Sequence, residues 1–324
     1  MYSQDELKRI VNRALVNIAY NTESEKLIDP VKYILSIGGK RIRPVLALMA
    51  YNLFKDKIDD AILPVTGLEI FHNFTLVHDD IMDKASVRRG FATVHNKWNI
   101  NQAILSGDVM AFITNECFLV TPTPLFHEVF RIFNKAAIDV CIGQQLDMDY
   151  EKTLIVTQQE YLRMIELKTA SLIAASLRIG ALFGSAGNND SELLYGFGKN
   201  LGLAFQIQDD LLDTFGDSKI FGKIPGGDIL AGKKTFLYIK AMEVSNSEQR
   251  KLLQKEFLDN QSEPQEKVKT VTGIYDRLNI KGLASNLAHD LINKALDQLD
   301  RLNVPYERKE ELALFVDSLS VRDH

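Results

Sequence analysis

Two pentapeptides carry the residues whose types and spacing could do chemistry. The motifs Asp79-Asp80-Ile81-Met82-Asp83 and Asp209-Asp210-Leu211-Leu212-Asp213 share one pattern of three carboxylates. Each motif follows an apolar-periodic run, which predicts that it lies on the last turns of a helix. Because positions i and i+4 share a helix face, the first and last Asp of each motif should point the same way. The middle Asp should lie about a quarter turn aside.

Like charges placed in this way repel, so each motif needs a compensating cation. Clusters of oxygen ligands suit hard cations such as Mg²⁺, which bridges one or two carboxylates to substrate phosphates. A single acidic run is usually a solvated helix face, but two copies placed directly after apolar runs favour a metal site. The two clusters together would grip a diphosphate through metal ions. An EF-hand calcium loop is excluded because its ligand spacing and central glycine are absent.

Local groups of Lys and Arg could bind the remaining phosphate charge. They occur in Gly38-Gly39-Lys40-Arg41-Ile42-Arg43-Pro44, Arg88-Arg89-Gly90 and Lys168-Thr169, and at Lys223 and Lys233 beside the Gly-rich segment 222–232. Pro44 suits a helix start, which would leave backbone N–H groups available for an anion. Exposed Lys and Arg side chains are usually solvated, and Lys234 and Arg41 are interpreted in this way. Lys168 stands in apolar company, so it needs an anionic partner or must extend to solvent.

Two further polar residues precede the Asp motifs by one or two helical turns. These residues are His72 and Gln206. Each could be a core residue that makes its hydrogen bonds within the protein or a residue that contacts the substrate, and the two alternatives are equal. The chain contains no Walker-type phosphate loop, no nucleophile elbow and no paired catalytic His. The lack of a nucleophile fits a mechanism in which diphosphate simply leaves.

The elements that must position these residues are helices. Apolar residues recur at steps of three and four almost throughout, and alternating β-branched runs are nearly absent, which predicts an all-α fold without a convincing sheet. Breaks fall at Gly38-Gly39, Thr121–Pro124, Gly184–Ser191, Phe215–Gly232 and Asn260–Glu266. Asn188 to Ser191 resemble a helix N-cap. No break resembles an interdomain linker, so residues 1–324 are expected to form one domain.

Composition bounds the class of protein. The 324 residues are 46% hydrophobic and carry a net charge of -5, so a large core is expected and nucleic acid is not an expected partner. Cys117 and Cys141 are predicted to be two core thiols in a reducing compartment. The apolar windows 103–120 and 170–183 contain charges that would be costly in a bilayer. We therefore expect a cytoplasmic protein without membrane insertion.

The sequence resembles the trans-isoprenyl diphosphate synthase, or polyprenyl synthetase, family. Seven blocks carry the resemblance: Gly38 to Pro44, His78 to Asp83, Arg88 to Gly90, Gly143-Gln144-Gln145-Leu146-Asp147, Lys168-Thr169, Gln206 to Asp213, and Gly227-Asp228-Ile229 through Lys233. The resemblance implies an all-α, single-domain bundle around a central cavity, with two Asp-rich helices across its mouth and a homodimer. It also implies a head-to-tail 1'-4 condensation of isopentenyl diphosphate with allylic diphosphates.

The resemblance also implies roles for particular residues. Asp79, Asp83 and Asp209 would bind two or three Mg²⁺ ions directly, supported by Asp80 and Asp213. Isopentenyl diphosphate would be held by Gly39, Lys40, Arg43, His72 and Arg89, and the allylic diphosphate by Arg88, Lys168, Thr169, Gln206, Lys223 and Lys233. Asp79, Asp83, Asp209, Lys168 and Lys223 would carry the catalysis.

In this family the side chains one to two turns before the first motif set the floor for the growing tail. In this chain they are Phe71, Phe74 and Thr75, although ordinary core packing also explains Phe74. One aromatic residue five positions before Asp79 resembles archaeal geranylgeranyl synthases, so a twenty-carbon product is expected. The alternatives are a farnesyl or longer-chain synthase, a terpene cyclase, and a catalytically silent subunit. The paired intact motifs argue against the last two.

Overall fold

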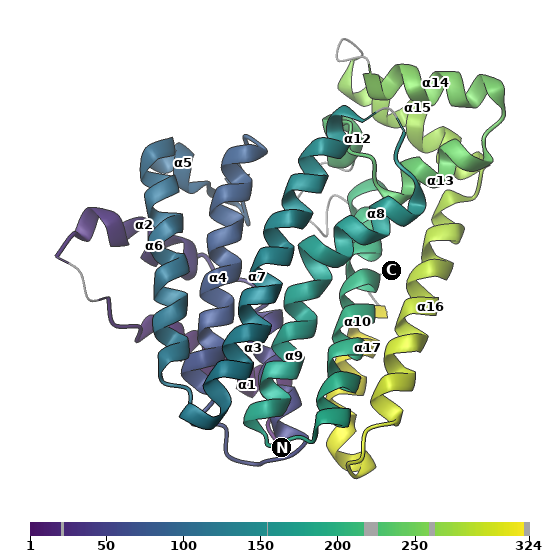
Figure 1. Ribbon diagram of the computed structural model, residues 1–324. Coiled ribbons are helices and arrows are strands. Elements are labelled where there is room, and N and C mark those ends of the chain that lie inside the picture. Colours follow the sequence, from purple (N-terminus) through teal and green to yellow (C-terminus); the bar gives the residue numbers. More distant parts are fainter. Residues whose placement is uncertain (21–22, 154, 217–225, 259–262, 321–324) are drawn as a thin grey trace. The chain divides into compact units, whose positions relative to one another are not determined.

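The chain is helical along almost all of its described length, which confirms the predicted all-α class. The computed structural model in Figure 1 describes residues 1–20, 23–153, 155–216, 226–258 and 263–320. Contacts divide the chain into two compact units. Unit 1 comprises Met1–Asn134, Ala175–Tyr195 and Leu302–Ala313, and unit 2 comprises Lys135–Ala174, Gly196–Arg301 and Leu314–His324.

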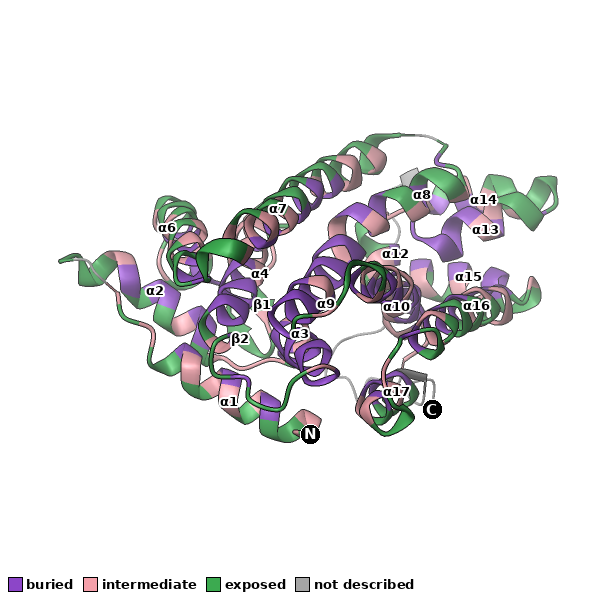
Figure 2. Cartoon of the chain, turned by 60° about the horizontal axis from the view of Figure 1, so that its bottom comes forward, coloured by how far each residue is buried: buried purple, intermediate pink, exposed green. Residues whose placement is uncertain are grey.

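Unit 1 is built from the N-terminal helices and one short hairpin. Its elements are α1 (Gln4–Val16), α2 (Glu25–Ser36), α3 (Ile42–Asn52), α4 (Ile62–Met82), β1 (Val87–Arg88), β2 (Phe91–Ala92), α5 (Val94–Lys97) and α6 (Ile100–Leu119). The core of this unit lies along α3 and α4, which are largely buried in Figure 2. Helix α4 can approach α6 closely because a Cβ on Gly67 would lie only 2.9 Å from the Cβ of Cys117.

Four helices have residues in both units. They are α7 (Thr123–Lys152), α9 (Ser171–Phe183), α10 (Asn188–Phe215) and α17 (Tyr306–Ser320). The other elements of unit 2 are α8 (Gln158–Ile165), the π-helical turn η1 (Glu166–Ala170), α12 (Gly227–Ala231), α13 (Phe236–Val244), α14 (Ser247–Leu258), α15 (Pro264–Arg277) and α16 (Ile280–Asp300). The predicted breaks at Gly38-Gly39 and before α7 are confirmed. Asn188 to Ser191 form the first turn of α10 rather than preceding it.

One short hairpin adds to the prediction, which found no convincing sheet. Strands β1 and β2 pair in antiparallel register, with Val87 opposite Ala92 and Arg88 opposite Phe91. Arg89 and Gly90 form the turn with φ of 55° and 81°, as a two-residue turn of type I′ requires. Strands of two residues are too short to show alternation in sequence, and Arg is not a usual residue at a left-handed position.

The π-helical turn η1 holds Lys168 and Thr169 between two glycines. A Cβ on Gly143 of α7 would lie 2.3 Å from the backbone nitrogen of Lys168, and one on Gly202 of α10 would lie 2.6 Å from the Cα of Ala170. Single π-helical turns inside α-helices occur often at functional sites. The close approach of both neighbouring helices therefore fixes the backbone from which Lys168 and Thr169 project.

The two cysteines are both free thiols, but their environments differ. Cys117 is buried, and burial raises the pKa of its thiol to about 12. Cys141 is exposed, so the prediction of a core position is wrong for this residue. Within the part of the chain that the structure describes, no helix combines the length and the apolar character needed to cross a membrane.

Candidate active site

The first Asp motif closes helix α4, as the sequence predicts. Asp83 is the C-cap residue, and its N–H donates to the carbonyl of Asp79 at 2.8 Å. This helical geometry places Asp79 and Asp83 on one face. Asp83 is exposed and Asp79 is partly exposed, so both carboxylates can reach solvent.

Asp80, the middle residue of the first motif, is turned into the protein. It is 1% exposed and accepts hydrogen bonds from Arg88 Nε at 2.8 and 2.9 Å. Arg88 Nη2 lies 2.7 Å from Asp80 Oδ1 and 3.6 Å from Asp79 Oδ2. Burial raises the pKa of Asp80, and the hydrogen bonds from Arg88 offset part of that rise. Arg88, a predicted ligand of the allylic diphosphate, therefore lies against the first motif.

The hairpin turn connects the first motif to the block Gly38 to Pro44. Arg89 Nη1 donates to the carbonyl of Gly38. Gly39 has φ of 144°, and a Cβ at this position would lie 2.8 to 3.0 Å from the guanidinium of Arg89. Glycine at position 39 thus permits the guanidinium to lie directly over the loop. Two blocks separated by about fifty residues in the sequence meet here. Gly39 and Arg89, both predicted to hold isopentenyl diphosphate, therefore lie side by side.

Three of the residues predicted to hold isopentenyl diphosphate influence one another electrostatically. Burial lowers the pKa of Arg43 to about 10, and the charge of Arg89 contributes to the decrease. Burial, followed by the charges of Arg43 and Arg89, holds the pKa of His72 well below its usual range. His72 is therefore a neutral ring beside two guanidinium groups at pH 7. Lys40 is exposed on the same loop.

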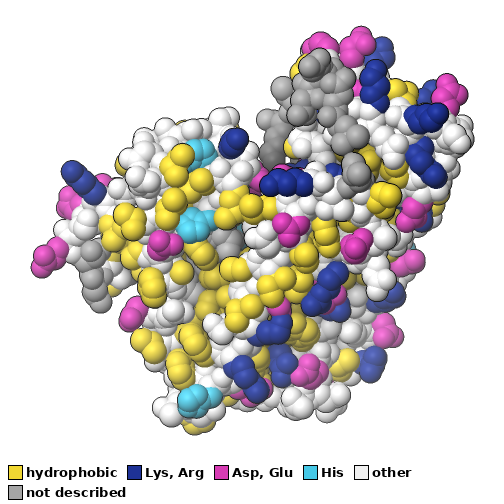
Figure 3. Space-filling model, turned by 45° about the horizontal axis from the view of Figure 1, so that its top comes forward, with side chains coloured by type: hydrophobic (Ala, Val, Ile, Leu, Met, Phe, Trp, Pro, Cys, Tyr) yellow, Lys and Arg dark blue, Asp and Glu magenta, His cyan; other side chains and the backbone are white. Residues whose placement is uncertain are grey.

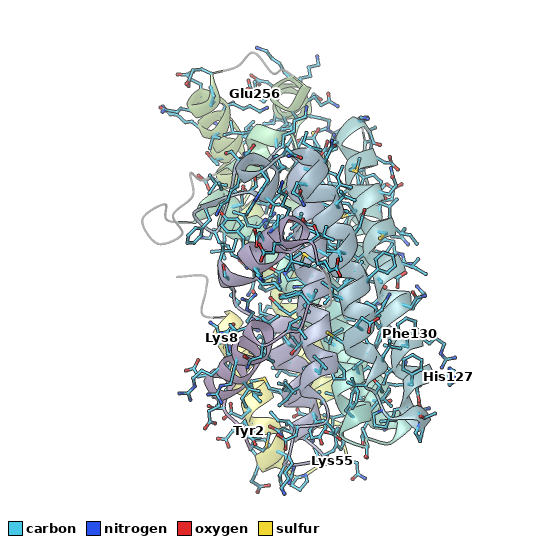
Figure 4. All side chains as sticks on the ribbon, turned by 90° about the vertical axis from the view of Figure 1, so that its left-hand side faces the viewer. Tyr2, Lys8, Lys55, His127, Phe130 and Glu256 are labelled. Carbon is cyan, nitrogen blue, oxygen red and sulfur yellow. The ribbon has the colours of Figure 1, made fainter. Side chains whose placement is uncertain are left out.

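An aromatic cluster lies behind the first motif. Phe71 contacts Phe74 edge to face at 5.4 Å between ring centroids and Phe133 at 5.3 Å, and Phe133 stacks on Phe118 at 4.6 Å. Phe130, labelled in Figure 4, extends the cluster along α7. Phe71 is buried, whereas Phe74 and Thr75 are partly exposed. Phe71 is thus a packing residue, and Phe74 presents part of its ring outside the core.

Unit 2 brings four predicted ligands of the allylic diphosphate into one pocket. The pocket has a volume of about 90 Å³ and is lined by Lys168, Thr169, Gln206 and Lys233, together with Tyr161, Asp147, Asp210, Asp228 and Lys234. Lys168 Nζ lies 2.7 Å from Asp147 Oδ2, which supplies the anionic partner that its apolar surroundings demand. Lys223, also predicted here, lies outside the described residues.

A chain of hydrogen bonds crosses this pocket. Thr169 Oγ1 donates to Gln206 Oε1 at 2.9 Å, and Gln206 Nε2 donates to Asp210 Oδ1 at 3.1 Å. The buried Tyr161 donates its hydroxyl to Asp210 Oδ2. Burial, followed by the charge of Asp228, raises the pKa of Asp210 well above its usual range. Asp210 and Thr169 together fix which end of the Gln206 amide faces each neighbour.

The end of the second motif organises the segment that carries Lys233. Asp213 Oδ2 accepts from the N–H of Asp228 at 2.8 Å, so this carboxylate holds the start of α12. Lys234 Nζ donates to the carbonyls of Tyr150 at 3.0 Å and Glu151 at 2.9 Å, near the C-terminal end of α7. Lys234 is therefore not the solvated side chain that the sequence suggested. These two hydrogen bonds hold the backbone next to Lys233 close to α7.

Several site residues gave little or no signal in the sequence. Tyr161 stands seven residues before Lys168 without a recognisable motif, and Asp147 and Asp228 lie in blocks that carried the resemblance without an assigned role. Their importance follows from contacts that form only when distant helices pack.

Among the described residues, no three His, Cys, Asp or Glu side chains are placed to hold a metal ion by themselves. Carboxylate pairs such as Asp79 with Asp83 fit Mg²⁺, which completes its shell with waters and substrate oxygens.

Comparison with known proteins decides the family. The family profile described as Polyprenyl synthetase matches residues 24–275. The chain belongs to the polyprenyl synthetase family. It is 36% identical to the geranylgeranyl diphosphate synthase of Sulfolobus acidocaldarius over 93% of both chains. It is 41% identical to the short chain isoprenyl diphosphate synthase of Methanocaldococcus jannaschii, over 77% of this chain and 76% of the relative.

A solved structure supports the same assignment of this polyprenyl synthetase. A crystal structure of geranylgeranyl pyrophosphate synthase matches with a TM-score of 0.95 and 39% identity, covering 99% of each chain. Membership of the family makes the protein an enzyme, a short-chain trans-prenyltransferase. The resemblance inferred from the seven sequence blocks is confirmed.

Tyr161→Phe tests the hydrogen-bond chain of unit 2. The variant removes one of the two side-chain donors to Asp210 and leaves the ring in place, so Asp210 is held less firmly where it accepts from Gln206. We expect kcat/KM for the allylic substrate to fall about tenfold, the range for losing one buried hydrogen bond to a charged group. Steady-state kinetics measure this ratio.

Tyr238→Phe is the matched control, because Tyr238 is also buried in unit 2, where its ring packs on Phe257 at 4.1 Å. The control should keep the kinetics of the unmodified enzyme. Equal kinetics for Tyr161→Phe would show that the hydrogen-bond chain has no part in the reaction.

Proposed function

We propose that this polyprenyl synthetase catalyses the Mg²⁺-dependent 1'-4 condensation of isopentenyl diphosphate with allylic diphosphates. Residues 1–324 would act as one polyprenyl synthetase domain. The observation that carries the proposal is the presence of two Asp-x-x-x-Asp carboxylate pairs, each accompanied by its own cationic groups. Arg43, Arg89 and His72 gather in unit 1, and Lys168 and Lys233 gather in unit 2. Two cationic sites suit a reaction of two diphosphates.

Asp79, Asp83 and Asp209 would hold the metal ions, and Asp80 and Asp213 would support them. When bound, Mg²⁺ supplies positive charge that stabilises a departing diphosphate. The buried contacts of Asp80 with Arg88 suit the supporting role, because this carboxylate already has a cationic partner. Asp79 and Asp83, which reach solvent on one helix face, suit direct coordination. We propose two or three ions per site.

The side chains of unit 2 would drive the ionisation step. Lys168, Lys233 and, by the family resemblance, Lys223 would donate to the oxygens of the leaving diphosphate, where negative charge develops as the allylic carbon–oxygen bond breaks. Thr169 and Gln206 would orient this group through the hydrogen-bond chain to Asp210. The isopentenyl double bond, positioned by Lys40, Arg43, His72 and Arg89, would then attack the allylic cation. The released diphosphate would take the proton that is lost.

For the product we propose geranylgeranyl diphosphate. The relatives of this chain include a geranylgeranyl diphosphate synthase, and a single aromatic residue, Phe74, stands five residues before Asp79. The Phe74 ring contacts Phe71 and His78, at 5.4 and 4.9 Å between ring centroids. These contacts hold the ring in place as a floor that a growing chain would meet.

We further propose a homodimer and a cytoplasmic location. Helix α6 carries Leu105, Phe112 and Leu119 at seven-residue spacing, exposed to 56%, 68% and 61%. Hydrophobic side chains also gather on the surface of unit 1 in Figure 3. An exposed apolar stripe of this kind suits burial against a second copy. The two free thiols suit a reducing compartment.

The direct test supplies purified protein with labelled isopentenyl diphosphate and each allylic primer, with and without Mg²⁺. Chromatography of the dephosphorylated products should show twenty-carbon chains only when Mg²⁺ is present. Asp79→Ala should lower kcat by about a hundredfold or more, as expected when a ligand of a catalytic metal is lost. A cyclic hydrocarbon, or no elongation by the unmodified protein, would contradict the proposal.

Phe74→Ala tests the floor assignment. Removing the ring opens space beyond the twenty-carbon chain, so the main product should lengthen by at least one five-carbon unit. Phe130→Ala is the control, since Phe130 belongs to the same aromatic cluster but lies on α7. Chromatography that finds the same product from Phe74→Ala and from the unmodified enzyme would reject the assignment.

Phe112→Asp tests the proposed dimer. A charge in the centre of the stripe should convert the dimer to monomers at micromolar concentration, as measured by sedimentation velocity. Tyr306→Asp, at a residue that is 74% exposed outside the stripe, should leave the dimer intact. A monomeric unmodified protein, or a Phe112→Asp variant that stays dimeric, would count against this surface.

A further inference from the structure

Arg41 is a buried residue, although its motif suggested a solvated cation. It is 4% exposed, and each nitrogen of its guanidinium donates to a different acceptor. Nε donates to Asn12 Oδ1 at 3.0 Å, Nη1 to Glu69 Oε1 at 2.9 Å and Nη2 to the carbonyl of Leu35 at 2.7 Å. These acceptors lie on α1, α4 and α2, so one side chain ties three helices together.

The backbone at Arg41 is in a conformation that its side chain must help to hold. Its φ is 55°, in the left-handed region that is unfavourable for a residue with a Cβ. Arg41 is also the N-cap residue of α3, and no side chain caps this helix. Lys40 precedes Arg41 and Arg43 follows it by two residues. The anchored side chain therefore fixes the point from which both of these cations extend.

Glu69 is the carboxylate partner of this anchor and faces the cationic residues of unit 1. It is 1% exposed and also accepts from Asn73 Nδ2 at 3.1 Å. It lies three residues before His72 on α4, and its charge raises the pKa of Arg43 against the effect of burial. A buried charge of this kind is costly without a partner, and Arg41 supplies it.

We propose that Arg41 and Glu69 are positioning residues for isopentenyl diphosphate. Their buried pair holds the segment Gly38 to Arg43 against α4, so that Lys40, Arg43, His72 and Arg89 converge on one diphosphate. Arg41 is 4% exposed and each of its three nitrogens donates to an acceptor inside the protein, so we assign it no contact with the ligand. The inference rests on the proposed function, which assigns the four converging residues to isopentenyl diphosphate.

The test compares Arg41→Met and Arg41→Lys in the full-length enzyme. We expect KM for isopentenyl diphosphate to rise about tenfold or more in both variants, the scale of losing a charged partner in a buried network. KM for the allylic substrate should change by less than about twofold, since four of its proposed ligands line the pocket of unit 2. A general loss of folding would lower the apparent kcat and leave both KM values unchanged. Arg41→Lys keeps the positive charge but not the three-way fork, so it separates positioning from charge alone.

A binding measurement provides a readout besides activity. Calorimetric titration of isopentenyl diphosphate in EDTA, without allylic substrate, should show the same loss of affinity in both variants. Asn12→Ala is the milder variant, because it removes only the Nε contact at 3.0 Å and leaves the Glu69 pair in place. It should raise the dissociation constant about two- to fivefold. This variant keeps the proposal testable if the substitutions at Arg41 fail to fold.

Arg308→Met is the matched control in the same unit. Arg308 donates to the carbonyl of Asn52 and to Asp56 Oδ1, both at 2.9 Å, without contacting the motif residues. It should bind isopentenyl diphosphate like the unmodified enzyme. Unchanged affinity in Asn12→Ala together with unchanged affinity in Arg41→Lys would overturn the positioning role. An unmodified protein that fails to bind isopentenyl diphosphate would instead refute the proposed function itself.

Discussion

The repulsion among three carboxylates within five residues is the constraint on which both Asp motifs depend. In each motif the middle carboxylate is buried and held by partners within its own unit. Arg88 binds Asp80 through two nitrogens, and Tyr161 and Gln206 donate to Asp210. The donors around each buried carboxylate stabilise its negative charge. They thereby compensate part of the repulsion among the three carboxylates of the motif. Asp79, Asp83 and Asp209 are the carboxylates that we propose to hold the metal ions.

The cationic side of the site depends on backbone conformations that most residues avoid. Gly38, Gly39, Arg41, Arg89 and Gly90 all have positive φ. These residues let two short loops approach each other until the Arg89 guanidinium meets the carbonyl of Gly38. Positive φ at Arg41 and Arg89 costs conformational energy, which the contacts of their side chains offset. The strained backbone therefore lies in the same two loops that carry the proposed ligands of isopentenyl diphosphate.

The sequence predicted the helical class, the end of α4 at the first motif and the grouping of Lys168, Thr169, Gln206 and Lys233. These features follow from local periodicity and from the resemblance. The roles of Arg41 and Lys234 were not predictable, because a cation whose acceptors lie on distant helices looks the same in sequence as a solvated one. The hairpin at Arg89 was missed because its strands are only two residues long. The π-helical turn at Lys168 depends on Gly143 and Gly202, which lie on other helices.

We propose that both Asp motifs act through metal ions on one allylic diphosphate. Calorimetric titration of inorganic diphosphate in the presence of Mg²⁺ tests it directly, with Asp79→Ala, Asp209→Ala and the double variant compared. If one metal-bridged diphosphate is shared, each single substitution should weaken binding nearly as much as the double, because the two sites are coupled. Removing Mg²⁺ should abolish the difference among the four proteins. Losses that simply add, or diphosphate binding that is equally tight without Mg²⁺, would contradict the claim.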